Sequence, residues 1–266
     1  MDLKIKGKRA LVTGSTSGIG EAIAKLLAAE GVTVIVHGRN RDRAEAVARE
    51  ITEAGGIADI AMGDLGSDSG ADAVATQACQ GGPVDILVNN AGRYRHLDWT
   101  TAQPSDWTET FEANVLSAVR MIQRLVPDMR KRGWGRVIQI GGGLASQPNA
   151  ELPDYNASLA ARHNLAVSLA RDLRNTGVTS NVVAPGAILV PAVKAILESV
   201  AQHRDWGNTW EDIEDACVRE MVPNDVGRLG RPEEIAAAVA YLSSSYADYV
   251  SGATIRVDGG TIRSVS

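Results

Sequence analysis

Short runs of valine, isoleucine and other apolar residues alternate along the chain with longer segments whose apolar positions recur at helical spacing. The apolar runs predict strands at residues 9–12, 32–36, 57–62, 84–88, 136–140, 179–183 and 253–257. The segments between them predict helices at 19–30, 41–54, 69–79 and about 107–131, a helix that carries Tyr155, and a last helix from Pro232. Because this alternation is typical of βαβ units, we predict an α/β fold with one doubly wound parallel sheet covered on both faces.

One stretch interrupts this alternation. Residues 190–226 contain Trp206 and Trp210 and do not continue the strand and helix rhythm. The chain shows no internal repeat beyond the βα alternation and no linker that would divide it. Its 266 residues are enough to enclose one sizeable core, so we predict a single domain over residues 1–266.

The composition narrows the class of partner. A formal net charge of −5 and a pI near 5.5 lack the clustered positive charge that nucleic acid or an anionic membrane requires, which favours small-molecule partners. No apolar segment reaches the ~20 residues of a membrane span and no signal-peptide core is present, so we expect a cytoplasmic protein. Cys79 and Cys217 lack metal-ligand spacing, so we expect no metal site and no disulfide, and both cysteines buried as small apolar residues.

The loops that follow the strands are expected to gather at one edge of the sheet, because right-handed crossovers bring the carboxyl ends of parallel strands together. Ligands of open α/β sheets bind at that edge. The loops concerned are 13–20, 37–41, 63–65, 89–96, 141–151 and 185–190. The first contains Gly14, Gly18 and Gly20, which let the backbone turn tightly and bring its N–H groups to a pyrophosphate at the positive end of a helix.

Further motifs follow the later strands in order: Asp64 and Leu65, then NNAG at 89–92, then Pro185 and Gly186. Together with TGSTSGIG at 13–20 and RVDGG at 256–260, they resemble the classical short-chain dehydrogenase/reductase family over essentially the whole chain. The resemblance implies a Rossmann-type domain with a variable helical substrate lid at 190–226, assembled as a homodimer or homotetramer. The cofactor-binding residues that it implies are Gly14, Thr16, Ser17, Gly18, Ile19, Asp64, Leu65, Asn90, Ala91, Gly92, Pro185 and Gly186.

The segment after the second strand selects between cofactors, because an acid there accepts ribose hydroxyls and repels a 2′-phosphate. Gly38 stands where the NAD-type acid of the family falls, and Arg39, Arg41 and Arg43 follow it. Arginine suits phosphate because its fork of N–H groups matches the phosphate oxygens. We therefore predict NADP(H) rather than NAD(H), with Arg39 as a cofactor ligand; the alternative is that these arginines form a solvated helix start. By resemblance, Asp64 contacts the adenine.

The resemblance also implies four residues that act together: an asparagine, a serine, a tyrosine and a lysine. In the family the tyrosine exchanges a proton with the substrate oxygen while hydride moves at the nicotinamide, and the lysine lowers the pKa of the tyrosine. Asn114 and Tyr155 match this set and are the predicted catalytic residues. The serine falls on Gly142 and the lysine on Leu159. A further departure is Val190, where many members carry a hydroxyl residue.

Without the ammonium group, Tyr155 loses the charge that favours phenolate, so its pKa is expected near the ordinary value of ~10. A protonated phenol is an acid, which favours carbonyl reduction over alcohol oxidation. Losing a donor to the reacting oxygen costs ~10²–10³ in rate in comparable sites. Candidate substitutes are Ser146, Ser158 and the polar loop 93–96, which is equally a solvated turn. Arg162 lies on nearly the same helix face as Tyr155, although helix packing or a subunit contact explains it better.

These residues predict an NADP(H)-dependent oxidoreductase that favours carbonyl reduction, with Tyr155 as the proton donor. Trp206 and Trp210 suggest a hydrophobic substrate beneath the lid, unless they pack against the domain or another subunit. His37 and His203 are interpreted as surface residues. Three alternatives stay open: a redox-neutral isomerase, lyase or cyclase on the same fold, a non-catalytic subunit paired with an active homologue, and an ordinary reductase inactivated by replacement of its serine and lysine.

Overall fold

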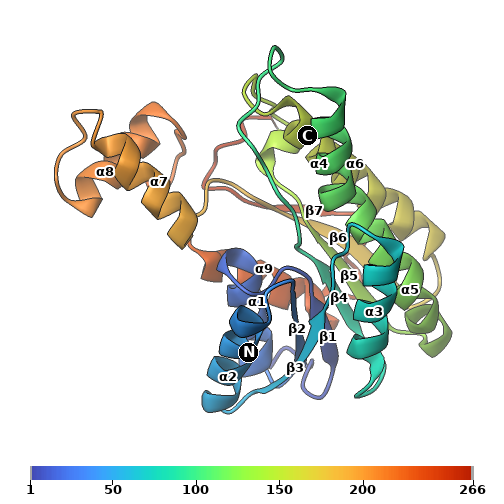
Figure 1. Cartoon of the computed structure of the whole chain (residues 1–266). Coiled ribbons are helices and arrows are strands. Elements are labelled where there is room, and N and C mark those ends of the chain that lie inside the picture. Colours follow the sequence, from blue (N-terminus) through green and yellow to red (C-terminus); the bar gives the residue numbers. More distant parts are fainter. Residues whose placement is uncertain (1, 265–266) are drawn as a thin grey trace.

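The computed structural model of the chain describes residues 2–264 and contains one seven-stranded sheet with helices on both faces (Figure 1). The strands are β1 (Arg9–Val12), β2 (Thr33–Gly38), β3 (Ile57–Met62), β4 (Ile86–Asn89), β5 (Gly135–Ile140), β6 (Val178–Pro185) and β7 (Thr254–Val257). Their order across the sheet is β3-β2-β1-β4-β5-β6-β7, and every neighbouring pair is parallel. The predicted α/β class and doubly wound parallel sheet are confirmed.

Two layers of helices cover the sheet. The helices of the described residues are α1 (Gly18–Ala29), α2 (Arg41–Glu53), α3 (Asp68–Cys79), α4 (Pro104–Phe111), α5 (Ser117–Arg132), α6 (Pro153–Asp172), α7 (Pro191–Ala201), α8 (Trp210–Glu220) and α9 (Pro232–Ser243), of which six form these layers. Helices α1, α2 and α9 bury apolar residues against one face, and α3, α5 and α6 cover the other. Strands β4, β5 and β6 are buried along their whole length, as expected for central strands of a parallel sheet covered on both faces.

The chain reverses its direction across the sheet between β3 and β4, because β3 is the edge strand and β4 returns to lie beside β1. Val12 at the end of β1 is level with Val88 near the end of β4. The loops that follow these two strands therefore leave the sheet at the same level and on opposite sides of a crevice. This reversal places residues 13–20 and 89–96 next to each other, where a ligand site of this fold is expected.

The predicted helix over about 107–131 is confirmed as an unbroken helical stretch over 104–132, but the π turn inside it was not predicted. The structure has α4, a π-helical turn over Glu112–Leu116, and then α5. A π turn inserts one residue into a helix without interrupting its apolar spacing for long, so the sequence pattern does not reveal it. The turn buries Asn114 and directs its side chain toward α6, where it donates a hydrogen bond to Ser158.

Helices α7 and α8 project from the body of the fold and form the helical segment within the predicted lid (Figure 1). Trp206, 4% exposed, belongs to an apolar cluster with Leu197 and Ile213, and its Nε1–H donates to Glu220 at 2.9 Å. Trp210 packs against the same cluster. The two tryptophans therefore build the core of this segment rather than the surface of a substrate pocket.

The two cysteines differ in burial. Cys217 is buried in the α8 cluster as predicted, whereas Cys79, at the end of α3, is exposed, so the prediction that it is buried is wrong. The helix ends at Cys79, one residue after the buried Ala78. Within residues 2–264, no helix has both the length and the apolar composition that crossing a membrane requires.

Candidate active site

The turn between β1 and α1 depends on its glycines. Gly14 and Gly18 adopt left-handed backbone angles, with φ of +65° and +59°. A Cβ on Gly20 would lie 2.5 Å from the carbonyl oxygen of Gly14, so no larger residue fits without a shift. Ser17 precedes α1 and provides no side-chain cap, which leaves the first N–H groups of the helix open to a ligand. A helix start of this kind is suited to bind a pyrophosphate.

The loop after β4 is joined to this turn through Thr13. The Thr13 hydroxyl accepts hydrogen bonds from the N–H groups of Asn90 and Ala91, both at 3.0 Å. The Asn90 side-chain amide donates to the carbonyl oxygens of Thr13 and Gly14 at 2.9 and 3.0 Å. Asn90 and Ala91, both predicted as cofactor ligands, thus hold the two loops in register and line the site from the β4 side.

His37 is 4% exposed, so the prediction that it is a surface residue is wrong. Its Nδ1 accepts the N–H of Gly14 at 3.0 Å, and its own N–H donates to the Ser15 hydroxyl at 3.0 Å. Burial lowers the pKa of His37 to about 4, so the imidazole is neutral near pH 7. His37 therefore fastens the glycine turn to β2. Strand β2 is buried over most of its length. The sequence alone does not reveal that the side chain of His37, a polar residue near the end of this strand, points inward.

The end of β2 carries the groups that face the adenosine end of the site. A Cβ on Gly38 would lie 2.5 Å from the Thr16 methyl carbon, so an acid at residue 38 has no room unless Thr16 moves. The exposed Arg39 guanidinium lies 3.9 Å from the Asp64 carboxylate. Arg41 also forms an ion pair, with Glu45 of α2 at 3.5 Å. The structure thus pairs the exposed Arg39 with Asp64 just after the end of β2.

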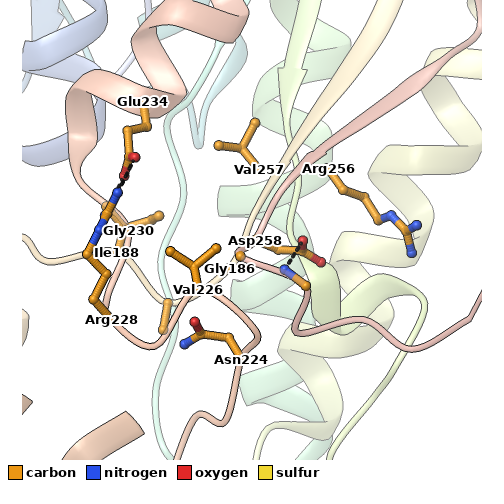
Figure 2. Close-up of a pocket in the computed structure, with 13 residues that line it drawn as sticks. Gly186, Ile188, Asn224, Val226, Arg228, Gly230, Glu234, Arg256, Val257 and Asp258 are labelled. Carbon is orange, nitrogen blue, oxygen red and sulfur yellow. Dashed lines mark hydrogen bonds and ion pairs between the residues drawn. The ribbon is translucent and has the colours of Figure 1, made fainter. Parts of the chain in front are cut away.

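Other predicted cofactor residues support the site from below or from the side. Ile19 packs against one sheet core, and Leu65 is buried in the other. Pro185 ends β6, and Gly186 follows it at the wall of a cavity of about 370 Å³ (Figure 2). That cavity lies between the loop after β6, the segment 224–230 and the end of β7.

The polar groups of this cavity are paired within the protein. Arg228 forms an ion pair with Glu234 at 2.7 Å, and Asp258 accepts the N–H of Gly260 at 3.1 Å (Figure 2). A Cβ on Gly186 would lie 2.8 Å from the Asp258 Cα, so this glycine permits the close approach of β6 and the C-terminal turn. None of the residues that line the cavity belongs to the group around Tyr155.

The predicted catalytic residues meet at the start of α6. The Asn114 amide donates to the Ser158 hydroxyl at 2.9 Å, and that hydroxyl donates to the backbone carbonyl of Tyr155 at 2.8 Å. Asn114 also exchanges hydrogen bonds with the backbone of Arg93 at 2.8 and 3.0 Å. A Cβ on Gly92 would lie 3.1 Å from the Asn114 Oδ1. Asn114 and Ser158 therefore position Tyr155 and the loop after β4, and Ser158 does not offer a free donor to a substrate.

The Tyr155 phenol is largely enclosed by protein. Burial raises its pKa above the ordinary value, the nearby positive charge of Arg162 lowers it, and Tyr94 adds to the increase. The Tyr94 ring lies 5.6 Å from the Tyr155 ring, centroid to centroid. The pKa is thus higher than the ordinary value expected from the sequence, because burial adds to the loss of the lysine. The phenol is protonated near neutral pH.

Gly142 and Leu159, the two residues predicted to depart from the family pattern, are neighbours in space. Leu159 is 2% exposed, and one of its methyl carbons lies 2.9 Å from the position of a Cβ on Gly142. His163 packs beside them, since its Nε2 accepts the N–H of Gly142 at 3.4 Å. An apolar contact therefore occupies the place in which the family pattern puts a hydroxyl and an ammonium group.

Arg162 is buried inside the chain rather than at a subunit contact. Its Nε donates to the carbonyl oxygen of Asn114 at 2.5 Å, and its two Nη atoms donate to those of Ile140 and Ala91, both at 2.6 Å. The sequence favoured helix packing as the role of Arg162, and that interpretation accounts for only part of these contacts. The sequence signal was the spacing of seven residues from Tyr155, but the three carbonyls come from separate segments that only the fold brings together.

The remaining candidate substitutes are less closely engaged. Arg93 and Arg95 of the loop after β4 form ion pairs with carboxylates of α4, so their charges are balanced. Ser146 is exposed at the end of the turn that follows Gly143. The loop 93–96 thus contributes the Tyr94 ring to the site, while its arginines face α4.

Comparison with known proteins agrees with this geometry. The profile of the short chain dehydrogenase family matches residues 8–201. The uncharacterized oxidoreductase YvaG of Bacillus subtilis is 38% identical over 269 residues, which cover 100% of both chains. The L-sorbose reductase of Gluconobacter frateurii, in complex with NADPH and L-sorbose, has a TM-score of 0.93 at 34% identity, with 100% of both chains covered. A 7α-hydroxysteroid dehydrogenase with NADH and 7-oxo glycochenodeoxycholic acid has a TM-score of 0.86 at 33% identity, with 100% of this chain and 98% of that one covered.

Proposed function

This chain belongs to the short chain dehydrogenase family, and we propose that it is an NADP(H)-dependent oxidoreductase that reduces a carbonyl group of a hydrophobic small molecule. Tyr155 is the proton donor in this proposal. The observation that carries it is the half-buried, protonated Tyr155 phenol at the same sheet edge as a glycine turn suited to pyrophosphate.

The choice of NADP(H) is supported by the end of β2. An exposed Arg39 offers its guanidinium where a 2′-phosphate would lie, and Gly38 provides no carboxylate to repel that phosphate. The similar L-sorbose reductase holds NADPH and the similar steroid dehydrogenase holds NADH, so the fold serves both cofactors. The residues after β2 therefore determine which cofactor binds, and Arg39 favours NADP(H) over NAD(H).

The chemistry assigned to Tyr155 is proton donation. When bound, NADPH supplies the hydride that adds to the carbonyl carbon, and the electron pair of the C=O bond moves to oxygen. The Tyr155 hydroxyl gives its proton to that oxygen, which yields the alcohol and a phenolate that takes up a proton from solvent. Because the pKa of Tyr155 is raised, the acid form prevails near neutral pH, and reduction is the favoured direction.

The altered residues set the expected rate. Gly142 offers the substrate oxygen no hydroxyl, and Leu159 offers Tyr155 no ammonium group. Each missing interaction costs ~10²–10³ in rate in comparable sites. We therefore propose that turnover is slower than in an enzyme that carries all four residues of the family set. We also propose that reduction is faster than the reverse oxidation.

The preference for a hydrophobic substrate rests on the surroundings of Tyr155. The Tyr94 ring lies 5.6 Å from the Tyr155 ring, and the apolar Leu159 follows Tyr155 by one turn on the same helix. The segment 190–226 is the proposed lid, although its tryptophans pack inside it.

Assembly as a homodimer or homotetramer is proposed through the outer face of α6, where Ala160 and other small residues are exposed. Static light scattering measures the mass of the particle in solution, and the mass of a monomer would contradict this proposal.

The test is turnover of NADPH with a panel of carbonyl compounds, from apolar ketones and aldehydes to 7-oxo bile acids and L-sorbose. We expect oxidation of NADPH in equal amount to alcohol formed, and loss of at least ~10²-fold in rate on Tyr155→Phe with NADPH affinity retained. Absence of turnover across the panel, or a rate that Tyr155→Phe leaves unchanged, contradicts the proposal. A product of unchanged oxidation level indicates a redox-neutral enzyme instead.

A further inference from the structure

Arg162 is a buried cation to which the reaction proposed above assigns no role. The side chain is 3% exposed, and its three hydrogen bonds go to backbone carbonyl oxygens of Asn114, Ile140 and Ala91. No carboxylate within residues 2–264 lies at ion-pair distance from it. Carbonyl dipoles stabilise a guanidinium without cancelling its charge. The positive charge therefore acts on whatever group shares this enclosed space.

Asn114 links the guanidinium to the first turns of α6. Its carbonyl oxygen accepts from the Arg162 Nε, and its side-chain amide donates to Ser158, whose hydroxyl donates to the carbonyl oxygen of Tyr155. Tyr155, Leu159 and Arg162 also fall on one face of α6, at intervals of four and three residues. The Arg162 charge is therefore held on the same face as the Tyr155 ring and residue 159.

We propose that Arg162 is a positioning residue for the Tyr155 proton, and that its guanidinium supplies the positive charge which the family pattern places at residue 159. In the reduction described above, the phenol becomes a phenolate as its proton passes to the substrate oxygen. A fixed cation stabilises this anion, and it acts through Tyr155 rather than by touching the substrate. The inference rests on the proposed function only for the role of Tyr155 as proton donor.

The ionisable groups around Tyr155 are consistent with this role. Burial lowers the pKa of Arg162 to about 10, so the guanidinium is charged at neutral pH, and its charge opposes the effect of burial on the pKa of Tyr155. Burial and the charge of Arg162 lower the pKa of His163, which leaves that imidazole neutral. Tyr94 faces Tyr155 from the loop after β4.

The acids near Tyr155 on α6 and on the elements packed against it have partners in the protein, and Glu112 of the π turn forms an ion pair with Arg120 at 2.9 Å. The acids of α4, Asp106 and Glu109, are paired with arginines of the loop 93–96. The buried Asp154 accepts the Thr110 hydroxyl at 2.6 Å. Residues 139–147 and 178–185 contain no ionisable side chain. Arg162 is therefore the cation that faces Tyr155 from among these elements.

Titration of residue 155 tests the inference without any assumption about the substrate. A fluorinated tyrosine, which ionises at lower pH than tyrosine, is placed at residue 155 and its ionisation is followed by ¹⁹F NMR in the intact protein. Arg162→Gln keeps hydrogen-bonding capacity without charge, Arg162→Met keeps length alone, and Arg162→Lys keeps the charge. The matched control is Arg171→Met, which removes an exposed arginine from the same helix.

We expect Arg162→Gln and Arg162→Met to raise the pKa of residue 155 by about 1 unit or more, and Arg162→Lys and Arg171→Met to leave it near the unchanged value. Adding Leu159→Lys to Arg162→Met should lower the pKa of residue 155 again. This double variant also replaces Arg162→Met in the comparison if the single variant fails to fold. An unchanged pKa in folded Arg162→Gln overturns the inference. The same pKa shifts in a protein that reduces no carbonyl would leave the inference standing and remove the proposed function.

Discussion

A methyl carbon of Leu159 lies 2.9 Å from the position that a Cβ would take on Gly142. The first residue belongs to α6 and the second to the loop after β5, so the contact joins two segments that meet at the proposed site. Gly142 has a φ of 177°, an extended conformation that any residue adopts, so space rather than backbone geometry favours glycine there. The two departures from the family pattern are therefore one packed unit rather than two separate losses.

A double-mutant cycle should show this coupling. Gly142→Ala is expected to lower the free energy of unfolding by about 1 kcal/mol, because the new Cβ presses on the Leu159 methyl group. In the Leu159→Ala background the same substitution should cost little, which gives a coupling free energy of about 1 kcal/mol. Urea denaturation of the four proteins measures it. Equal costs of Gly142→Ala in both backgrounds would show that the two side chains are independent.

Restoring the family residues should shift the balance between reduction and oxidation. With Leu159→Lys and Gly142→Ser together, an ammonium group favours the Tyr155 phenolate and a hydroxyl meets the substrate oxygen. Alcohol oxidation with NADP⁺ at pH 9 should then rise at least ~10-fold, given the ~10²–10³ that such donors contribute.

The single change Gly142→Ser is the control for this reversion. Its Cβ meets Leu159, so we expect no gain from it alone. Reduction that falls in the double variant would mean that the present residues serve a different reaction.

Arg39 should discriminate between the two cofactors. Arg39→Met removes a charge-assisted contact to the 2′-phosphate, so the Kd for NADPH is expected to rise about 10- to 100-fold. The Kd for NADH, which lacks that phosphate, should change little. Arg41→Met is the matched control, since Arg41 is a second exposed and ion-paired arginine, two residues further along the chain. Isothermal titration of all three proteins decides, and equal losses for both cofactors in Arg39→Met would contradict the assignment.

His37 should make stability depend on pH. Its pKa in the folded chain is lowered to about 4 by burial, below the ordinary 6.5, so the unfolded chain takes up the proton first as pH falls. The contribution of the neutral His37 to the free energy of unfolding is fully present above pH 6.5 and is lost between pH 6.5 and 4. By pH 5 about 2 kcal/mol of it is lost.

His37→Asn offers a side-chain oxygen to the N–H of Gly14 and does not titrate in this range. Urea denaturation at pH 7 and pH 5 should therefore show a smaller loss in His37→Asn than in the unchanged chain. Equal losses in the two proteins would mean that His37 is solvated in the folded state.

The sequence was sufficient for the sheet and for the nucleotide turn. Strand β3 was predicted with the bounds that the structure has, Ile57–Met62, because apolar and β-branched runs between helical segments have few other interpretations. The glycines of 13–20 were recognised because tight turns leave few residue choices. The π turn around Asn114 was missed, since a single inserted residue barely alters the apolar spacing.

The proposed site was predictable only where one segment acts alone. Tyr155 and Asn114 follow from motif spacing, but the burial of His37 depends on what covers β2, and the role of Arg162 depends on carbonyls from three distant segments. The contact between Gly142 and Leu159 was equally invisible, because each was read as a missing group rather than as a partner of the other. Tertiary contacts of this kind have no local signature.

The cluster around Trp206 has an evolutionary consequence. Because α7 and α8 enclose an apolar core of their own, mutations inside this segment, the proposed lid, leave the packing of the sheet undisturbed. Tyr155, Leu159 and Arg162, by contrast, share one helix with the interior of the fold, so changes among them are constrained by one another. In a lineage of such chains, the range of accepted substrates can therefore diversify quickly while the chemistry at the tyrosine changes slowly.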